Sequence, residues 1–232
     1  MMKHIKSISL SVLAFLMLVT LVSCEKGNSG IILSIKSDID ALGMKKSTSA
    51  AAVVITDFAL SIREVEFKLD ESDFDSSEVQ FRGPYEVNLL LDGDALTQTI
   101  GDADVEEGTY DVLRFKLHKS KDWAQESVLY DRSIFLAGTI DGIPFEFWHD
   151  TSENFDFENS DGIIVSDSDV NIVVKFNIDM FLSSVHSIDL SEAIDTDEDG
   201  LIEINPDDDD GNGDIADQLK ENIKMAADLI KE

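Results

Sequence analysis

The chain has 232 residues, of which 48 are Asp or Glu and 18 are Lys or Arg, so its net charge is -30 and its pI is near 4.1. This charge repels phosphate backbones and excludes nucleic acid as a class of partner. A hydrophobic content of 43%, with 13 Phe, is too high for a wholly disordered chain and predicts a folded core. The single cysteine excludes an internal disulfide framework and any Cys-based zinc cluster.

The N-terminus has the layout of a secretory signal. Lys3 and Lys6 precede the uncharged run 8–22, which is shorter than the about 20 apolar residues of a membrane-spanning helix. The order Leu21-Val22-Ser23-Cys24 resembles the bacterial lipobox, whose cysteine receives a diacylglyceryl group and becomes the first mature residue. We therefore predict a signal peptide over 1–23 and lipidation of Cys24. The alternative is an ordinary signal with an incidental cysteine.

Lipidation determines the predicted location. Each buried CH₂ group contributes about 0.8 kcal/mol, so two or three acyl chains hold the protein on a bilayer. Residues 24–29 then form a lipidated tether, and the lipid bilayer is the first predicted partner. The expected location is the bacterial cell envelope, at the outer membrane, with the protein facing the periplasm or the exterior.

The next region, 30–190, alternates short apolar runs with turn residues, and the period of two is cleanest over 170–178. This pattern predicts an all-β domain, an antiparallel β-sandwich. Asp141-Gly142 separates two such runs by two residues and predicts a hairpin. Further turns are expected at 82–84, 92–94 and 161–162. The predicted strands are 31–35, 52–56, 62–69, 79–81, 85–91, 110–117, 134–140, 143–149, 163–166 and 170–178.

Four segments here resemble the DUF4382 type of bacterial envelope domain. They are Ile55–Asp57, Ile62–Phe67, Tyr85–Leu90 and Val105–Phe115, in the order in which that family has a "TD" strand, a "DLL" strand and a "PxGxYxxIRL" hairpin. Asn88 and Glu106 stand where the family often has Asp and Pro. The resemblance covers about 30–119 and extends weakly to about 180. It implies a sandwich-like fold in the envelope, without a settled activity, for which carbohydrate binding is commonly suggested.

The last part, 191–232, begins with a dense acidic segment. From Asp195 to Asp217 there are 11 carboxylates and no Lys or Arg, and their mutual repulsion favours cation binding. Two registers resemble a calcium loop, with oxygen-bearing residues at positions 1, 3 and 5, glycine at 6 and an aliphatic residue at 8. The predicted Ca²⁺ ligands are Asp195, Asp197, Asp199, Leu201 (carbonyl) and Glu203 in the first register, and Asp208, Asp210, Asn212 and Asp214 (carbonyl) in the second.

Neither register is a complete EF-hand, because position 12 is Pro206 in the first and Leu219 in the second. The loops are closer to the degenerate calcium loops of dockerins and thrombospondin repeats, with Asp207 or Asp209 closing the first site. We therefore expect a structural Ca²⁺. The alternative is a disordered acidic spacer. Beyond the loops, apolar residues at helical spacing over 215–230 predict one amphipathic helix that packs on the sandwich or on a partner.

Catalytic signals are few. After removal of the signal only His118, His149 and His186 remain, and no serine lies in a GxSxG motif. Lone histidines are more often structural than catalytic. Paired carboxylates are uninformative in so acidic a chain, so a carboxylate-dependent glycoside hydrolase is the weakest alternative. We do not expect an enzyme.

Trp148 is a candidate for ligand binding. Alternation along its strand puts Glu146, Trp148 and Asp150 on the face opposite Phe145 and Phe147. A tryptophan flanked by acids is suited to stack on a sugar ring whose hydroxyls the carboxylates bind. The alternative is a tryptophan covered by a loop, such as 155–157, and Trp123 is a weaker candidate.

These features predict a membrane-anchored envelope lipoprotein that acts as a non-catalytic binding or assembly module with structural calcium. A glycan or an envelope protein is the expected ligand. The alternative is a purely structural or protein-interaction lipoprotein with a disordered acidic spacer.

Overall fold

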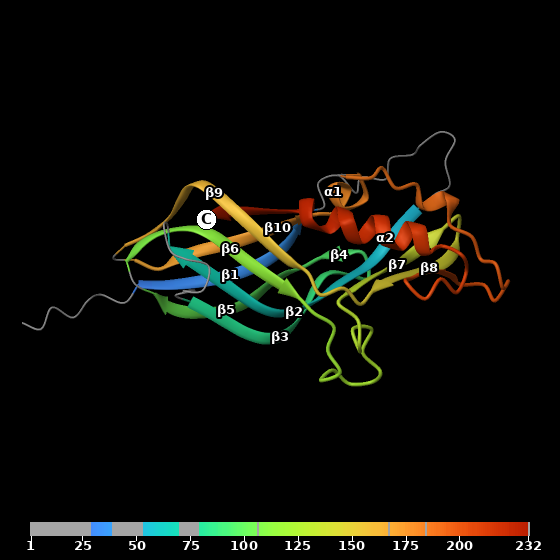
Figure 1. Cartoon of the computed structure of the whole chain (residues 1–232), viewed down its shortest axis with the longest axis horizontal. Coiled ribbons are helices and arrows are strands. Elements are labelled where there is room, and N and C mark those ends of the chain that lie inside the picture. The colour runs from blue at the N-terminus through green and yellow to red at the C-terminus, as the bar shows by residue number, and fades with distance from the viewer. Residues whose placement is uncertain are drawn as a thin grey trace, which may run out of the picture.

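A computed structural model describes residues 29–38, 53–69, 79–105, 107–166, 168–183 and 185–231. These residues form two mixed β-sheets with few helices (Figure 1), which confirms the predicted all-β, sandwich-like fold. The predicted signal peptide, Cys24 and the tether up to residue 28 lie outside the described residues. In the described part, no helix combines the length and the apolar character needed to cross a bilayer.

The smaller sheet has four strands in the order β12-β10-β1-β5. β1 and β10 run parallel in its centre, and the two outer strands pair antiparallel with them. Every second residue from Val170 to Ile178 is buried, as the alternation predicted. The bounds are β1, Ser29–Asp38; β5, Thr97–Val105; β10, Val170–Asn177; and β12, Ala227–Lys231.

The larger sheet is organised around one long strand, β2. The first half of β2 pairs with β7 and its second half with β6, while β3 lies along its other side. β7 continues to β8 and β11, and β6 continues to β9. The bounds are β2, Val53–Leu69; β3, Val79–Leu91; β4, Asp94–Ala95; β6, Gly108–Leu117; β7, Ile134–Ile140; β8, Ile143–His149; β9, Asn154–Val165; and β11, Ile202–Ile204.

Turn predictions had mixed outcomes. The hairpin at Asp141-Gly142 is confirmed, and both residues have the positive φ angles of 51° and 84° that such a tight turn needs. The turn expected at 82–84 is instead an irregularity inside β3, because pairing with β2 resumes after a register shift. The turn expected at 161–162 likewise lies inside β9, and β5 was not predicted at all.

Each sheet contains one parallel pair, β1–β10 in the smaller sheet and β8–β11 in the larger, so neither is purely antiparallel. The C-terminal part contributes a strand to both sheets. β11 pairs in parallel with β8 in the larger sheet, and β12 joins the edge of the smaller one. The helix predicted over 215–230 is correct only for α2, Gly213–Asn222. After a short 3₁₀ helix the chain becomes β12, because its last apolar residues pair with β10.

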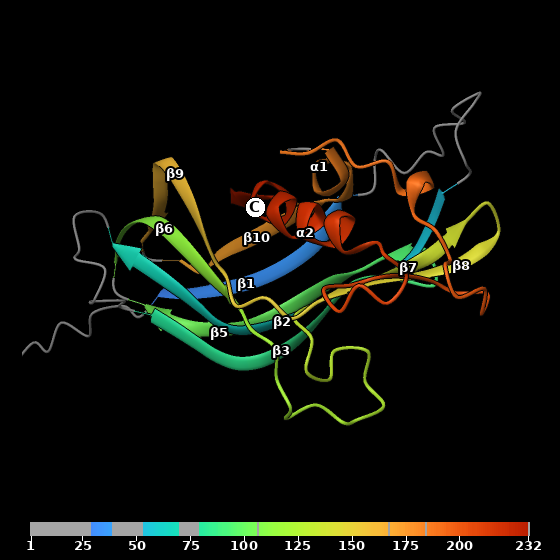
Figure 2. The same cartoon turned by 45° about the vertical axis from the view of Figure 1, so that its right-hand side comes forward.

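The core fills the space between the sheets and extends under two helices. α1, Ile178–Ser183, and α2 lie over the end of the molecule that contains β7 and β8 (Figure 2). Phe181 of α1 packs on Phe58 of β2 and Phe147 of β8, with ring centroids 5.2 and 6.1 Å apart. Leu219 of α2 is fully buried in the same cluster. The C-terminal segment is therefore an integral part of the fold.

Candidate cation site

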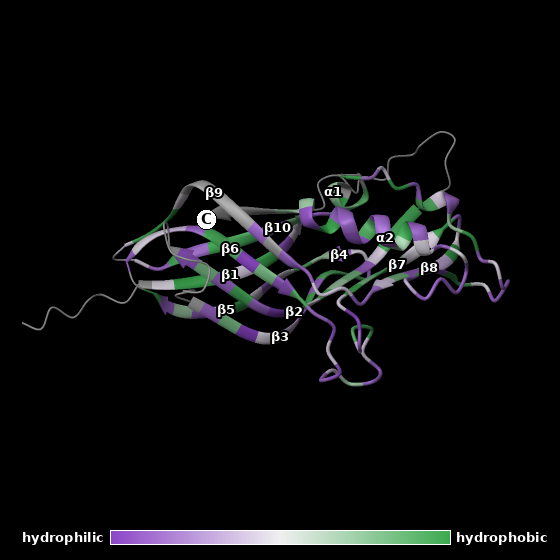
Figure 3. Cartoon of the chain, in the orientation of Figure 1, coloured by the Kyte–Doolittle hydropathy of each residue, from purple (hydrophilic) through white to green (hydrophobic). Residues whose placement is uncertain are grey.

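The acidic segment forms the loops between Leu190 and α2, at the end of the molecule where β7 and β8 lie (Figures 1 and 3). It is folded against the sheet. β11 pairs with β8 in the middle of the segment, and Ile202 and Ile204 are buried there. These two side chains fix the acidic loops on either side to the core.

The loop that begins at Asp195 follows the first predicted register. Gly200, at position 6, has a φ of 93°, which favours glycine, and its N–H donates to Asp195 Oδ2 over 3.0 Å. Asp197 Oδ1 accepts from the N–H of Asp199, and Asp199 Oδ1 accepts from the N–H of Leu201. These local hydrogen bonds orient the side chains of Asp195, Asp197 and Asp199 toward the backbone of their own loop. Ile202, at position 8, is the buried anchor that the register predicted.

Asp210 comes from the second predicted register but its side chain is built into the first loop. It is only 1% exposed. Its Oδ1 accepts from the N–H of Thr196 at 2.9 Å, and its Oδ2 accepts from the N–H of Glu203 at 2.8 Å. Burial alone would raise the pKa of Asp210, but the N–H groups of Glu203, Thr196 and Asp197 hold it below its ordinary value. Asp210 is therefore a buried carboxylate anion.

Asp195, Asp197 and Asp210 form a carboxylate cluster, in which one oxygen of each lies within 4.8 Å of the others. Two oxygens bound to one Ca²⁺ ion at about 2.4 Å are at most about 4.8 Å apart, so the spacing suits a shared ion. Each like-charge pair costs on the order of 1–3 kcal/mol at such separations. Asp195 Oδ1 is buried and has no hydrogen-bond partner among the described residues, which leaves it available as a ligand.

Glu203 adds to the negative field beside this cluster. Burial raises the pKa of Glu203, and the charges of Asp209 and Asp210 raise it further. The ordinary effect of a bound cation is the opposite, because a positive charge favours ionised carboxylates. A cation bound here would therefore lower the electrostatic repulsion among these carboxylates.

The second register repeats one bond of the first, because the N–H of Gly213, at position 6, donates to Asp208 Oδ1 over 2.6 Å. Its residues at positions 3 and 5 have other contacts, since Asp210 accepts hydrogen bonds from the first loop. Asn212 accepts from the N–H of Ile194, and its amide donates to the carbonyls of Ile194 and Glu203. Gly213 is the first residue of α2. Asp208 and Asp214 instead line a separate acidic cleft of about 340 Å³ beside α2. The carboxylate that joins the first loop is Asp210 rather than Asp207 or Asp209, a long-range contact that local spacing does not reveal.

Glu146 and Trp148 lie on the same face of β8, as the alternation predicted, opposite the buried Phe145 and Phe147. The Trp148 ring packs against a small cluster that includes Phe135 and Leu129. The guanidinium of Arg132 lies 4.8 Å from the ring centroid. A sugar ring on that face would have to displace Arg132.

The cover of Trp148 comes from the segment 118–133, which protrudes from the sheet in Figures 1 and 2. The side chains of Phe155 and Phe157, the cover suggested by the sequence, are outside the described part. Trp123 of the same segment donates to Ser61 Oγ over 3.2 Å. Asp150 follows the end of β8 and is bound to Lys119, whose hydrogen bond lowers the pKa of Asp150.

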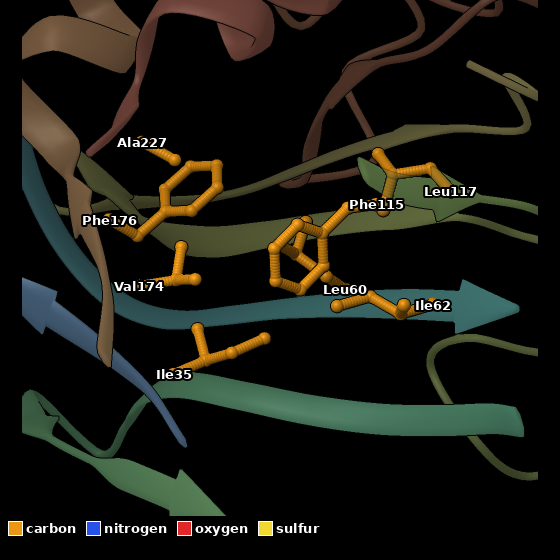
Figure 4. A pocket seen from close by; sticks show the side chains of 8 residues that line it. All are labelled: Ile35, Leu60, Ile62, Phe115, Leu117, Val174, Phe176 and Ala227. Carbon is orange, nitrogen blue, oxygen red and sulfur yellow. The ribbon is translucent and has the colours of Figure 1, made fainter. Parts of the chain in front are cut away.

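An apolar cavity lies between the sheets (Figure 4). Its volume is only about 20 Å³, which is close to the minimum for one water molecule. It is a packing gap rather than a ligand pocket. It is lined by Ile35, Leu60, Ile62, Phe115, Leu117, Val174, Phe176 and Ala227.

No protein-family model, curated protein or solved structure matches this chain. The DUF4382 resemblance therefore stays a prediction from the sequence.

Proposed function

We propose that the protein is a lipid-anchored module of the bacterial cell envelope that holds a structural Ca²⁺ ion and serves in binding or assembly rather than catalysis. The observation that carries the calcium part of this proposal is the carboxylate cluster of Asp195, Asp197 and Asp210, with its unpartnered Asp195 Oδ1. The lipid anchor rests on the sequence around Cys24. A cluster of like charges on a folded β framework is stabilised when a cation joins it.

The donor set favours Ca²⁺ over other metals. Only oxygen ligands converge in the carboxylate cluster, without the nitrogen or sulfur ligands that zinc prefers. The irregular loop with a left-handed Gly200 suits an ion that tolerates irregular coordination by six to eight oxygens. The ion would connect the start of the acidic segment with the turn before α2. Its role is to hold β11 and α2 on the sheet.

Calcium binding is tested by thermal unfolding of the lipid-free chain, residues 25–232, with calcium and with a chelator. A ligand present at about 100 times its Kd stabilises a protein by about 2.7 kcal/mol. Wild type should melt higher with calcium. Asp195→Asn should lose this gain and keep its stability in chelator. Asp214→Asn is the matched control, because it removes an acid from the separate cleft, and it should keep the full gain.

Equal melting temperatures with calcium and with chelator would contradict the calcium proposal. An equal loss of the calcium gain in Asp195→Asn and Asp214→Asn would indicate diffuse charge screening instead of a site. The envelope location is tested separately, because Cys24→Ser should move the protein out of the membrane fraction. Retention of Cys24→Ser in that fraction would contradict the lipid anchor.

Glycan binding remains a proposal from the sequence. It requires that a polysaccharide quench tryptophan fluorescence saturably and that Trp148→Ala remove binding. Because Arg132 covers the ring, Arg132→Ala should strengthen such binding. Unchanged binding in Trp148→Ala would exclude Trp148 as the platform.

A further inference from the structure

His149 occupies an unusual position at the end of β8. It is 7% exposed and shares the buried face of β8 with Phe145 and Phe147, the face that α2 contacts. Its backbone is fixed, because the N–H and the Oγ of Ser133 both donate to its carbonyl. Yet Nδ1 and Nε2 are both buried without a hydrogen-bond partner in the described part of the chain. A buried imidazole whose nitrogens lack hydrogen-bond partners costs stability, so the packing of this ring is energetically unfavourable.

Charged groups approach the ring from several elements. Asp217 of α2 places Oδ1 3.7 Å from Nε2, and Asp150 places Oδ1 3.7 Å from Nδ1. Both distances are too long for hydrogen bonds. Lys220, one turn after Asp217 on α2, adds a positive charge. Lys119 from the segment 118–133 neutralises Asp150.

Lys119 itself lies in the fields of Asp131, from its own segment, and Asp207, from the turn before α2. The two carboxylates nearest the ring are thus unequal, since Asp150 is already paired and Asp217 has a mostly exposed side chain. Both lie within ion-pair distance of a protonated ring, but neither is close enough to hydrogen-bond to it.

We propose that His149 is an acid-sensitive latch between β8 and α2, in which the neutral ring lets the helix pack and protonation loosens it. The helix is the element that moves, because β8 is held by strands on both sides whereas α2 lies on the surface. When α2 moves away, water reaches the imidazolium.

The sign of the effect follows from the cost of burying the charged ring. Burial lowers the pKa of His149, and Lys220 lowers it further, while Asp150 and Asp217 oppose the shift without cancelling it. In the loosened state the pKa returns to about 6.5. The packing of α2 is therefore fully favoured above about pH 6.5, and this advantage is lost as the pH falls toward the lower pKa of the packed state. Each pKa unit between the states changes their ratio by up to about tenfold.

Loosening of α2 would also affect the segments that precede and follow the helix. The helix starts three residues after Asp210, and at its other end Asn222 donates to the carbonyls of Phe181 and His186. The latch does not rest on the calcium proposal, because none of the groups around His149 belongs to the carboxylate cluster.

The test is an NMR titration of His149 in the lipid-free chain, residues 25–232, at fixed calcium, combined with hydrogen exchange of the α2 amides at about pH 7.5 and about pH 5.5. His149 should titrate below about 6.5. After correction for intrinsic exchange, protection of α2 should fall several-fold at the lower pH. His149→Phe, which extends the row of Phe145 and Phe147, should abolish this fall. His118→Gln is the matched control and should keep it, because the His118 ring bonds to Ser152 Oγ and not to α2 in the described part of the chain.

Titration of His149 at or above about 6.5 would overturn the proposal. An equal fall in α2 protection in His149→Phe, or no fall in wild type, would do the same. If His149→Phe does not fold, Asp217→Asn replaces it. Removal of the carboxylate beside Nε2 should lower the pKa of His149 further. A rise in that pKa would overturn the proposal.

Discussion

Asn212→Ala would measure how firmly the acidic segment is tied to the fold. Asn212 is 2% exposed, and its side chain forms three hydrogen bonds to the backbone of other segments, two to Ile194 and one to Glu203. It was predicted from the sequence as a calcium ligand. In the structure, its amide joins the residue before the acidic segment, the middle of β11 and the start of α2.

The expected cost follows from these three bonds. A protein hydrogen bond contributes about 0.5–1.5 kcal/mol net, so their loss destabilises the chain by about 1.5–4.5 kcal/mol. Ile194 is an exposed residue, so water can reach part of the freed backbone. We therefore expect about 3 kcal/mol. Because the side chain acts as a structural link, the loss should be the same in calcium and in chelator.

Urea unfolding of wild type and Asn212→Ala in both conditions is the assay. Asn205→Ala is the matched control, because Asn205 is equally buried and also makes three bonds, but only within its own turn, 205–209. It should cost less than Asn212→Ala. A cost below about 1 kcal/mol for Asn212→Ala, or a cost seen only with calcium, would refute the assigned role.

Other substitutions test the framework. Arg114→Met removes a two-bond ion pair with Asp156 and should cost about 1 kcal/mol near pH 7 in urea unfolding. Arg114 lowers the pKa of Asp156, so this stability is present above about pH 4 and the difference between variant and wild type should shrink as the pH falls below it; a constant difference would contradict the pairing. Gly138→Ala would put a Cβ 1.9 Å from the carbonyl oxygen of Val54, and a loss of folded yield should follow; wild-type melting would contradict the β2–β7 contact. Phe147→Ala should cost about 3–5 kcal/mol by thermal unfolding, and a cost below about 1 kcal/mol would contradict its core position.

The fold class was predictable because strand alternation and tight-turn chemistry are local. Val170–Ile178 and the Asp141-Gly142 hairpin follow from residues that lie within a few positions of one another. The parallel pairs were not predictable, since β11 reaches β8 only through long-range packing. β12 was mistaken for helix because its apolar residues continue the helical spacing of α2.

The candidate site was predictable in part for the same reason. The first loop has its glycine and its buried anchor at the expected positions, since both depend on local backbone geometry. The joining of Asp210 to that loop depends on β11 folding between them. His149 gave no usable signal in sequence, because its isolation from partners arises when α2 packs over β8.

Isothermal titration of the chelator-treated, lipid-free chain, residues 25–232, with calcium tests the central claim most directly. Saturable heat with a stoichiometry of about one, absent in Asp195→Asn and retained in Asp214→Asn, is the predicted result. No heat in wild type, or equal heat in both variants, would contradict a calcium ion held by Asp195, Asp197 and Asp210.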